Sequence, residues 1–173
     1  MKKRLLSAIL SLCMLLTMAP TVAFAAEDDE GNTAPATSGT CGAEGSESSV
    51  TWKLTQNNEG NENPTYTLTI SGNGAMADYA VGKAPWHVAL SEAANRKQIN
   101  QIELSSGLTH IGDNAFLQAS VTDVKIPDTV ISIGTNAFWN CNTIQTTIPA
   151  SVQELGATAF YGTFVVNVDA NSP

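Results

Sequence analysis

Apolar side chains occupy every second position in two stretches of the first half of the chain, residues 50–55 and residues 65–70. Threonine, lysine and other polar residues stand between them, and a period of two is typical of a strand with one buried face. Residues 56–64, QNNEGNENP, are rich in turn and loop formers. The pattern predicts a β-hairpin with a long loop, and residues 71–74, SGNG, are expected to end its second strand.

A different element begins at residues 84–87, APWH. Good helix formers with few helix breakers follow in residues 88–97, so we expect a short helix there. Residues 41–98 are therefore predicted to form an N-terminal β-hairpin region that caps the structure after it.

From residue 99 onward the sequence repeats with a step of 22 residues. A central phenylalanine, the glycine four positions before it and three apolar positions recur at this step. The members of these columns are Phe116, Phe138 and Phe160; Gly112, Gly134 and Gly156; Ile111, Ile133 and Leu155; Leu108, Val130 and Val152; and Leu104, Ile126 and Ile148. A period in the twenties is typical of a solenoid, in which each turn relies on its neighbour for burial. Residues 99–173 are thus predicted to be a short, mainly β solenoid of about three repeats, truncated because no polar capping repeat closes it.

Within one turn we expect a short strand at residues 124–126, ended by Pro127, which has no N–H for a ladder. Gly134 is expected in a turn conformation that costs energy for a residue with a Cβ atom. The phenylalanine column is predicted to fill the centre of the coil as a structural spine. Thr146 stands in the column of Val124, which predicts a weaker third strand.

A second column of large side chains follows the spine by one residue. Its members are Leu117, Trp139 and Tyr161. A stripe at repeat spacing is either a candidate binding strip on the surface or a packing contact with a neighbouring coil, and the sequence leaves both open.

The first 25 residues have the layout of a cleaved secretory signal peptide. Basic residues precede an apolar run over residues 5–18, Pro20 follows, and Ala23 and Ala25 place small side chains before a cleavage site. The apolar run is shorter than the roughly 20 residues that a membrane-spanning helix needs. Residues 26–40 are acidic and poor in apolar side chains, which predicts a disordered linker.

Charge narrows the classes of partner. The 173 residues include 8 Lys and Arg against 16 Asp and Glu, a net charge of −8 at pH 7. Such a chain lacks the clustered basic residues that nucleic acid or anionic lipid requires. We therefore expect no nucleic-acid partner and no membrane insertion after signal cleavage. In an oxidising compartment Cys41 and Cys141 can pair, although we favour two thiols.

No constellation in the sequence predicts catalysis, a metal site or a cofactor. His87 and His110 lack the spacing of metal ligands. His110 shares a repeat column with Ser132 and Glu154, which indicates a variable surface position. There is no G-x-S-x-G motif, and residues 169–171 lack the glycine and distal glutamate of a calcium loop. We therefore predict that the chain is not an enzyme.

Residues 126–141, IPDTVISIGTNAFWNC, resemble the leucine-rich-repeat unit of BspA-like bacterial surface proteins, I-P-x-x-V-x-x-I-G-x-x-A-F-x-x-C. Residues 51–54, 68–76 and 85–86 are similar to the leader often seen before those repeats. The unit here is shorter than the family's usual one, and only Cys141 fills the cysteine column. The resemblance implies a leucine-rich-repeat fold and adhesion to host or neighbouring cells.

Together these observations predict a secreted or cell-surface module that binds an extracellular protein or glycan. Self-association through the open end of the solenoid is a further expectation, because an uncovered strand edge invites pairing. Two alternatives remain open: an accessory repeat module of a larger secreted enzyme, and a structural spacer. An enzyme would show turnover, an adhesin would bind without turnover, and a spacer would do neither.

Overall fold

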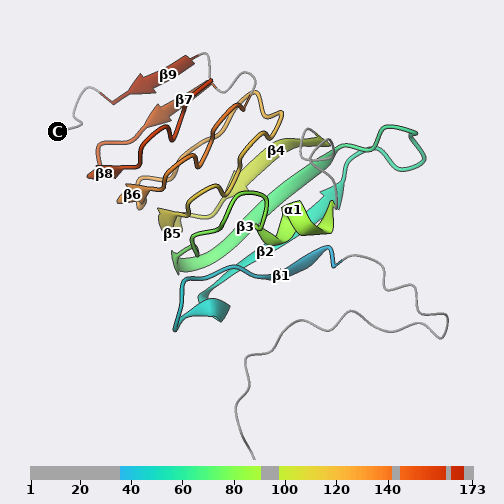
Figure 1. Cartoon of the computed structure of the whole chain (residues 1–173), viewed down its shortest axis with the longest axis horizontal. Coiled ribbons are helices and arrows are strands. Elements are labelled where there is room, and N and C mark those ends of the chain that lie inside the picture. The colour runs from blue at the N-terminus through green and yellow to red at the C-terminus, as the bar shows by residue number, and fades with distance from the viewer. Residues whose placement is uncertain (1–35, 91–97, 142–144, 163–164, 170–173) are drawn as a thin grey trace, which may run out of the picture.

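The computed structural model describes residues 36–90, 98–141, 145–162 and 165–169. The repeat turns stack side by side, and the N-terminal strands and helix lie at one end of the stack (Figure 1). The strands are β1 (Ser38–Thr40), β2 (Val50–Gln56), β3 (Tyr66–Ala75), β4 (Ile99–Leu104), β5 (Gly107–Ile111), β6 (Ser132–Ile133), β7 (Gln145–Ile148), β8 (Glu154–Leu155) and β9 (Val165–Val168), with one 3-10 turn at Glu47–Ser49 and one α-helix, α1 (Pro85–Ala89). The expected signal peptide, residues 1–25, lies outside the described residues.

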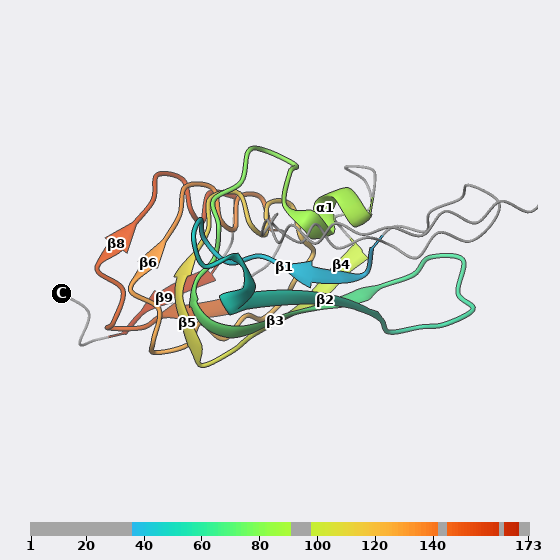
Figure 2. The ribbon, with the colours of Figure 1, turned by 90° about the horizontal axis from the view of Figure 1, so that it is seen from below.

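The expected hairpin is present at the capping end. Strands β2 and β3 pair antiparallel, with Trp52 opposite Ile70 and Leu54 opposite Leu68. All four side chains are buried. Alternate residues therefore face the core, as the period of two predicted. The long ribbon of β2 and β3 and the loop that joins them project from the stacked turns (Figure 2).

Strand β3 is longer than predicted, because residues 71–74 continue the strand instead of ending it. Gly72 and Gly74 both have a φ of 118°, which favours glycine. A Cβ atom on Gly72 would lie 2.1 Å from the carbonyl oxygen of Ser49. The two glycines let β3 run on to pair in parallel with β5. The cap and the repeats consequently share one sheet.

The linker ends earlier than expected. Ser38–Thr40 form β1, which pairs antiparallel with β2, so the prediction of disorder up to residue 40 was wrong for these residues. The pairing satisfies backbone groups that a polar sequence would otherwise leave to water. Gly39 allows the approach, since a Cβ atom there would lie 2.9 Å from Nε1 of Trp52. Residues 26–35 of the expected linker lie outside the described residues.

Helix α1 begins before the helix that the sequence predicted over residues 88–97. Pro85 occupies its first turn, where a missing N–H costs nothing. Trp86 is fully buried, and its Nε1 donates a hydrogen bond of 2.7 Å to the carbonyl oxygen of Ala115. This bond fixes α1 on the first repeat turn. Residues 91–97 of the expected helix lie outside the described residues.

Strands β5, β6 and β8 form a parallel ladder that continues the sheet of β3. His110 lies opposite Ser132, and Ser132 lies opposite Glu154, so the ladder has the 22-residue step of the sequence. Strands β7 and β9 form a second parallel sheet, in which Ile148 lies opposite Val168. The last step is therefore two residues shorter. The described fold is mainly β, with parallel strands in the repeat region.

Residues 124–126 do not form the expected strand, although their apolar side chains are buried as predicted. Asp123 alone of this segment makes a bridge, to Gln145. The third strand is not weakened by threonine. Thr146 lies within β7, and its buried hydroxyl donates a hydrogen bond of 2.7 Å to the carbonyl oxygen of Val124.

The glycine column is required for space and not for a special φ. Gly134 lies outside the left-handed region, contrary to the prediction, and a Cβ atom there would lie 2.4 Å from Oδ1 of Asp113 in the preceding turn. The left-handed residue stands two positions later, with φ of 54° at Asn114, 55° at Asn136 and 56° at Thr158. Asparagine tolerates this region better than a β-branched residue does.

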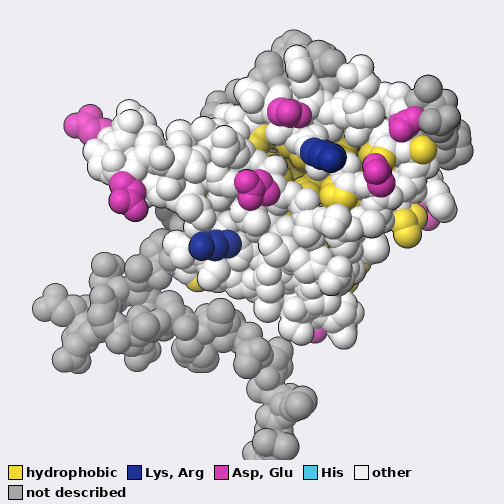
Figure 3. Space-filling view, turned by 180° about the vertical axis from the view of Figure 1, so that it is seen from behind, with side chains coloured by type: hydrophobic (Ala, Val, Ile, Leu, Met, Phe, Trp, Pro, Cys, Tyr) yellow, Lys and Arg dark blue, Asp and Glu magenta, His cyan; other side chains and the backbone are white. Residues whose placement is uncertain are grey.

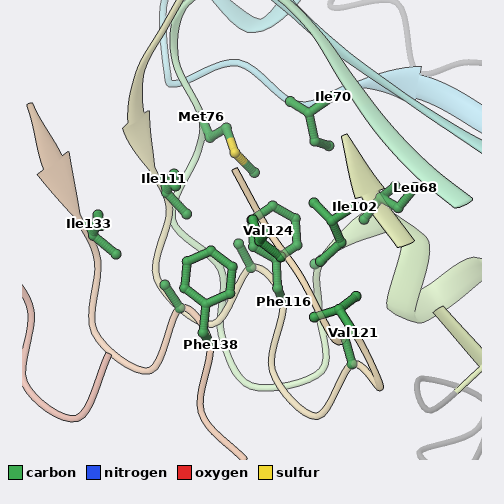
Figure 4. Packing of buried hydrophobic residues seen from close by; sticks show 14 of the residues in the cluster. Leu68, Ile70, Met76, Ile102, Ile111, Phe116, Val121, Val124, Ile133 and Phe138 are labelled. Carbon is green, nitrogen blue, oxygen red and sulfur yellow. The ribbon is translucent and has the colours of Figure 1, made fainter. Parts of the chain in front are cut away.

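The core runs through the middle of the stacked turns. The rings of Phe116 and Phe138 have centroids 5.1 Å apart, and Phe138 and Phe160 repeat this distance. Trp86 extends the stack at the capping end, 5.9 Å from Phe116. Figure 4 shows Phe116 and Phe138 among aliphatic side chains from several turns. Within the described residues, no helix is long and apolar enough to cross a membrane.

Candidate functional site

The column after the spine phenylalanines divides into one buried and two outer side chains. Leu117 is only 4% exposed, so at this position the packing alternative holds. Trp139 is half-buried, and Tyr161 is 64% exposed. Exposure rises along the column because each turn covers the one before it, and the last turn has no described successor. The rings of Trp139 and Tyr161 stack at 6.4 Å with an angle of 12° between their planes.

The backbone between the turns holds this aromatic pair in place. The N–H of Gln118 donates to the carbonyl oxygen of Trp139 at 2.9 Å, and the N–H of Asn140 donates to that of Tyr161 at 2.7 Å. Gln118, Asn140 and Gly162 form a second left-handed column, with φ of 64°, 55° and 76°. The backbone carbonyl of each aromatic residue is thus held by the turn on its N-terminal side. The pair presents flat, apolar ring faces with a phenolic hydroxyl at one end, which suits an apolar or sugar surface.

A polar chain that sequence reasoning missed connects the cap with the first two repeat turns. Nε2 of His110 lies 3.1 Å from Oδ1 of Asp78, and Nδ1 of His110 lies 2.7 Å from Oγ of Ser132. The same Asp78 oxygen accepts a hydrogen bond of 2.8 Å from the N–H of Asp113. The shared column of His110 and Ser132 could have indicated their contact. Asp78 gave no signal, because it lies before the repeats.

The charge state of the Asp78 carboxyl determines which ring nitrogen of a neutral His110 carries the proton. Partial burial acts to raise the pKa of this carboxyl, but the hydrogen bonds from Asp113 and His110 and the histidine charge outweigh it and lower the pKa. An ionised carboxylate only accepts, so a neutral His110 carries its proton on Nε2 and accepts the Ser132 hydroxyl at Nδ1. The serine thus has a base within hydrogen-bond reach. These side-chain contacts tie the segment that follows β3 to β5 and β6.

The two cysteines of the described residues are buried and free, so no disulfide joins Cys41 to Cys141. Burial raises the pKa of each thiol to about 12. The sulfur of Cys141 donates a hydrogen bond of 3.0 Å to the carbonyl oxygen of Phe116, one turn earlier. A thiol with such a pKa carries almost no thiolate at neutral pH, so these side chains serve packing and not nucleophilic chemistry.

His87 is buried and lies edge-on to Trp86, with ring centroids 6.2 Å apart. Among the described residues, no group of three or more His, Cys, Asp or Glu side chains is arranged to hold a metal ion.

Comparison with known proteins agrees with this geometry. Residues 91–172 match the family described as BspA type leucine rich repeat region. A crystal structure of a leucine-rich repeat protein from Eubacterium ventriosum is similar in fold, with a TM-score of 0.52 and 23% sequence identity. The match covers 78% of this chain and 45% of that one, so the chain spans less than half the length of the solved protein. No curated protein matches the chain in sequence.

The parallel ladder with its repeating step agrees with the leucine-rich-repeat match over residues 91–172. The repeat region of this chain, residues 91–172, belongs to the BspA type. The resemblance carried by residues 126–141 is thereby confirmed. Leucine-rich-repeat domains are generally binding modules without catalytic activity, which directs attention to the exposed surfaces.

Proposed function

We propose that the chain is a secreted or cell-surface binding module that holds an extracellular protein or glycan, in adhesion to host or neighbouring cells. The signal-peptide layout of residues 1–25 supports export. The leucine-rich-repeat fold supports binding, because repeat arrays expose extended contact surfaces. The observation with the most weight is the exposed ring of Tyr161 stacked on Trp139.

The aromatic pair suits binding for energetic reasons. Each ring has only two side-chain torsions to fix, so it offers a large contact area at a small cost in conformational entropy. Aromatic side chains are also enriched among the residues that dominate binding energy. The backbone hydrogen bonds between turns already hold both residues, which reduces the ordering that a partner would have to impose.

The test compares a Trp139→Ala, Tyr161→Ala double variant with the wild type on a printed glycan array and a panel of immobilised extracellular proteins. A matched control replaces Val81 and Val88 by alanine, since these are 64% and 59% exposed in the capping region. We expect the control to bind the same spots as the wild type and the double variant to bind about tenfold more weakly or worse. Undiminished binding by the double variant, or no binding by the wild type, contradicts the proposal.

We further propose that the repeats form a short solenoid whose outer end mediates self-association. Among the strands that the structure describes, β8 and β9 stand last in their sheets. Leu155 and Val168 on these strands are 54% and 61% exposed. An unpaired strand edge with apolar side chains is a template for another chain. Light scattering should show mass that rises with protein concentration, and a Leu155→Lys, Val168→Lys variant should stay monomeric. Association that survives both lysines would contradict this interface.

A further inference from the structure

A shallow groove crosses the face of the molecule shown in Figure 3. It consists of two adjoining hollows, of about 490 Å³ and about 420 Å³, on either side of residues 123–128. Both hollows are lined by Lys125 and Asp128. Figure 3 shows apolar side chains exposed in the hollow, a basic side chain over them and acidic side chains around it.

The groove lies where one repeat turn does not form a strand. Residues 123–128 stand one repeat after β4 and one repeat before β7, so Lys125 shares its column with Glu103 and Thr147. Only Asp123 of this segment makes a bridge, to Gln145 of β7. The surface therefore sinks on both sides of the segment instead of continuing as a flat sheet.

The rim of the groove is acidic. Glu103, Asp123 and Asp128 are exposed carboxylates that line it, and Lys125 is the exposed cation between them. The ion pair that the structure shows among the described residues is His110 with Asp78, so these rim charges do not neutralise one another by direct contact. The carboxylate of Glu103 is held at the rim, because Oε2 accepts a hydrogen bond of 3.1 Å from Oγ1 of Thr69.

The walls of the second hollow are apolar. Ile102 is buried, Leu104 is half-buried and Pro127 is buried beneath the rim. An occupant that matches both features has an apolar side chain for the walls and positive charges for the carboxylates on either side. Successive side chains of an extended peptide point to opposite faces, so every second residue can face the groove.

We propose that this acidic groove, residues 102–104 and 123–128, binds an extended cationic peptide segment of a partner protein. Charge complementarity selects this occupant, since an anionic ligand would meet the carboxylates and a second copy of this chain, with its net charge of −8, would bring the same rim. The described lining of both hollows is built from aliphatic, proline and polar side chains, without the ring faces on which sugars stack. The groove is independent of the Trp139–Tyr161 pair.

The probe for this surface is a fluorescein-labelled peptide, KLKLKLK, titrated with the full chain and followed by fluorescence anisotropy. Two comparison peptides, KSKSKSK and ELELELE, remove the apolar side chains and reverse the charge. We expect KLKLKLK to bind more tightly than KSKSKSK, and ELELELE not to bind. Binding should be lost in about 1 M NaCl, where the Debye length is about 3 Å.

Three single-site variants and the aromatic double variant locate the contact. Asp128→Asn should raise the Kd about two- to fivefold, and Lys125→Gln should lower it by a similar factor. Glu59→Gln is the matched control, because Glu59 is an exposed acid in the loop between β2 and β3. Equal weakening by Glu59→Gln and Asp128→Asn would show diffuse attraction to an acidic chain and would overturn the proposal. Equal binding of KSKSKSK and KLKLKLK, or no tightening in Lys125→Gln, would also overturn it. The Trp139→Ala, Tyr161→Ala variant should bind KLKLKLK unchanged, which separates this site from the proposed function.

Discussion

The middle phenylalanine of the spine gives the sharpest test of how the repeat turns hold together. Phe138 is fully buried, and its ring centroid lies 5.1 Å from those of both Phe116 and Phe160. Phe138→Ala removes apolar surface from the centre of the stack. It leaves a cavity between two turns, because the backbone hydrogen bonds fix the spacing of these turns. Replacing a fully buried phenylalanine by alanine lowers the free energy of unfolding by about 3–5 kcal/mol. We expect the upper part of this range, because two ring pairs are lost together.

Urea unfolding followed by far-UV circular dichroism measures this loss. Phe160→Ala is the matched comparison, since Phe160 is half-buried and stacks on one described ring, which lowers the expected loss to about 1–2 kcal/mol. Tyr161→Ala, at an exposed position, should lower the free energy of unfolding less than Phe138→Ala or Phe160→Ala does. The reasoning is refuted if Phe138→Ala shifts the unfolding midpoint no further than Phe160→Ala at an equal denaturant slope.

Three further predictions concern the turns and the polar chain. Thr158→Asn should raise the free energy of unfolding by about 1 kcal/mol, because Thr158 has a φ of 56° and asparagine tolerates this left-handed region better than threonine does. An unchanged urea midpoint would contradict this. Gly134→Ala should lower the free energy of unfolding by about 2 kcal/mol, because the new Cβ would lie 2.4 Å from Oδ1 of Asp113. A urea midpoint equal to that of the wild type would contradict this and show that the turns can separate. The lowered pKa of Asp78 stabilises the fold above the unfolded value of about 4, and this is lost as pH falls through the folded value. Melting temperatures of wild type and Asp78→Asn should therefore converge as the pH falls below about 4, and a difference that stays constant through this fall refutes the role of the carboxylate.

Several local features of this protein could be read from the sequence because they depend on neighbouring residues or on the period. The alternation in residues 50–55 and 65–70 placed one face of β2 and β3 in the core, and the two strands pair as a hairpin. The 22-residue step set the register of β5, β6 and β8, since equivalent residues of successive turns must lie opposite one another. The phenylalanine column was recognisable for the same reason.

Other features depend on what each residue meets in the folded chain. The repeat identified Gly134 as a fixed glycine, but it did not show why glycine is needed there. The reason is the close approach of Asp113 in the preceding turn, which leaves no space for a Cβ atom. Leu117 and Tyr161 share a column, yet one is buried and the other is 64% exposed. Their difference comes from position in the stack, which a repeat pattern does not record.

The candidate surfaces show the same division. The sequence identified Trp139 and Tyr161 as a pair by their spacing, and the tertiary structure decided that their rings stack and that Tyr161 is exposed. The contact of His110 with Asp78 joins residues 32 positions apart across the boundary between cap and repeats. The acidic groove lies where residues 124–128, between β4 and β7 along the repeat, form no strand. A periodic sequence determines which residues lie opposite one another along the stack. The burial of each residue, and its contacts with residues that are not its repeat equivalents, depend on how the folded chain packs around it.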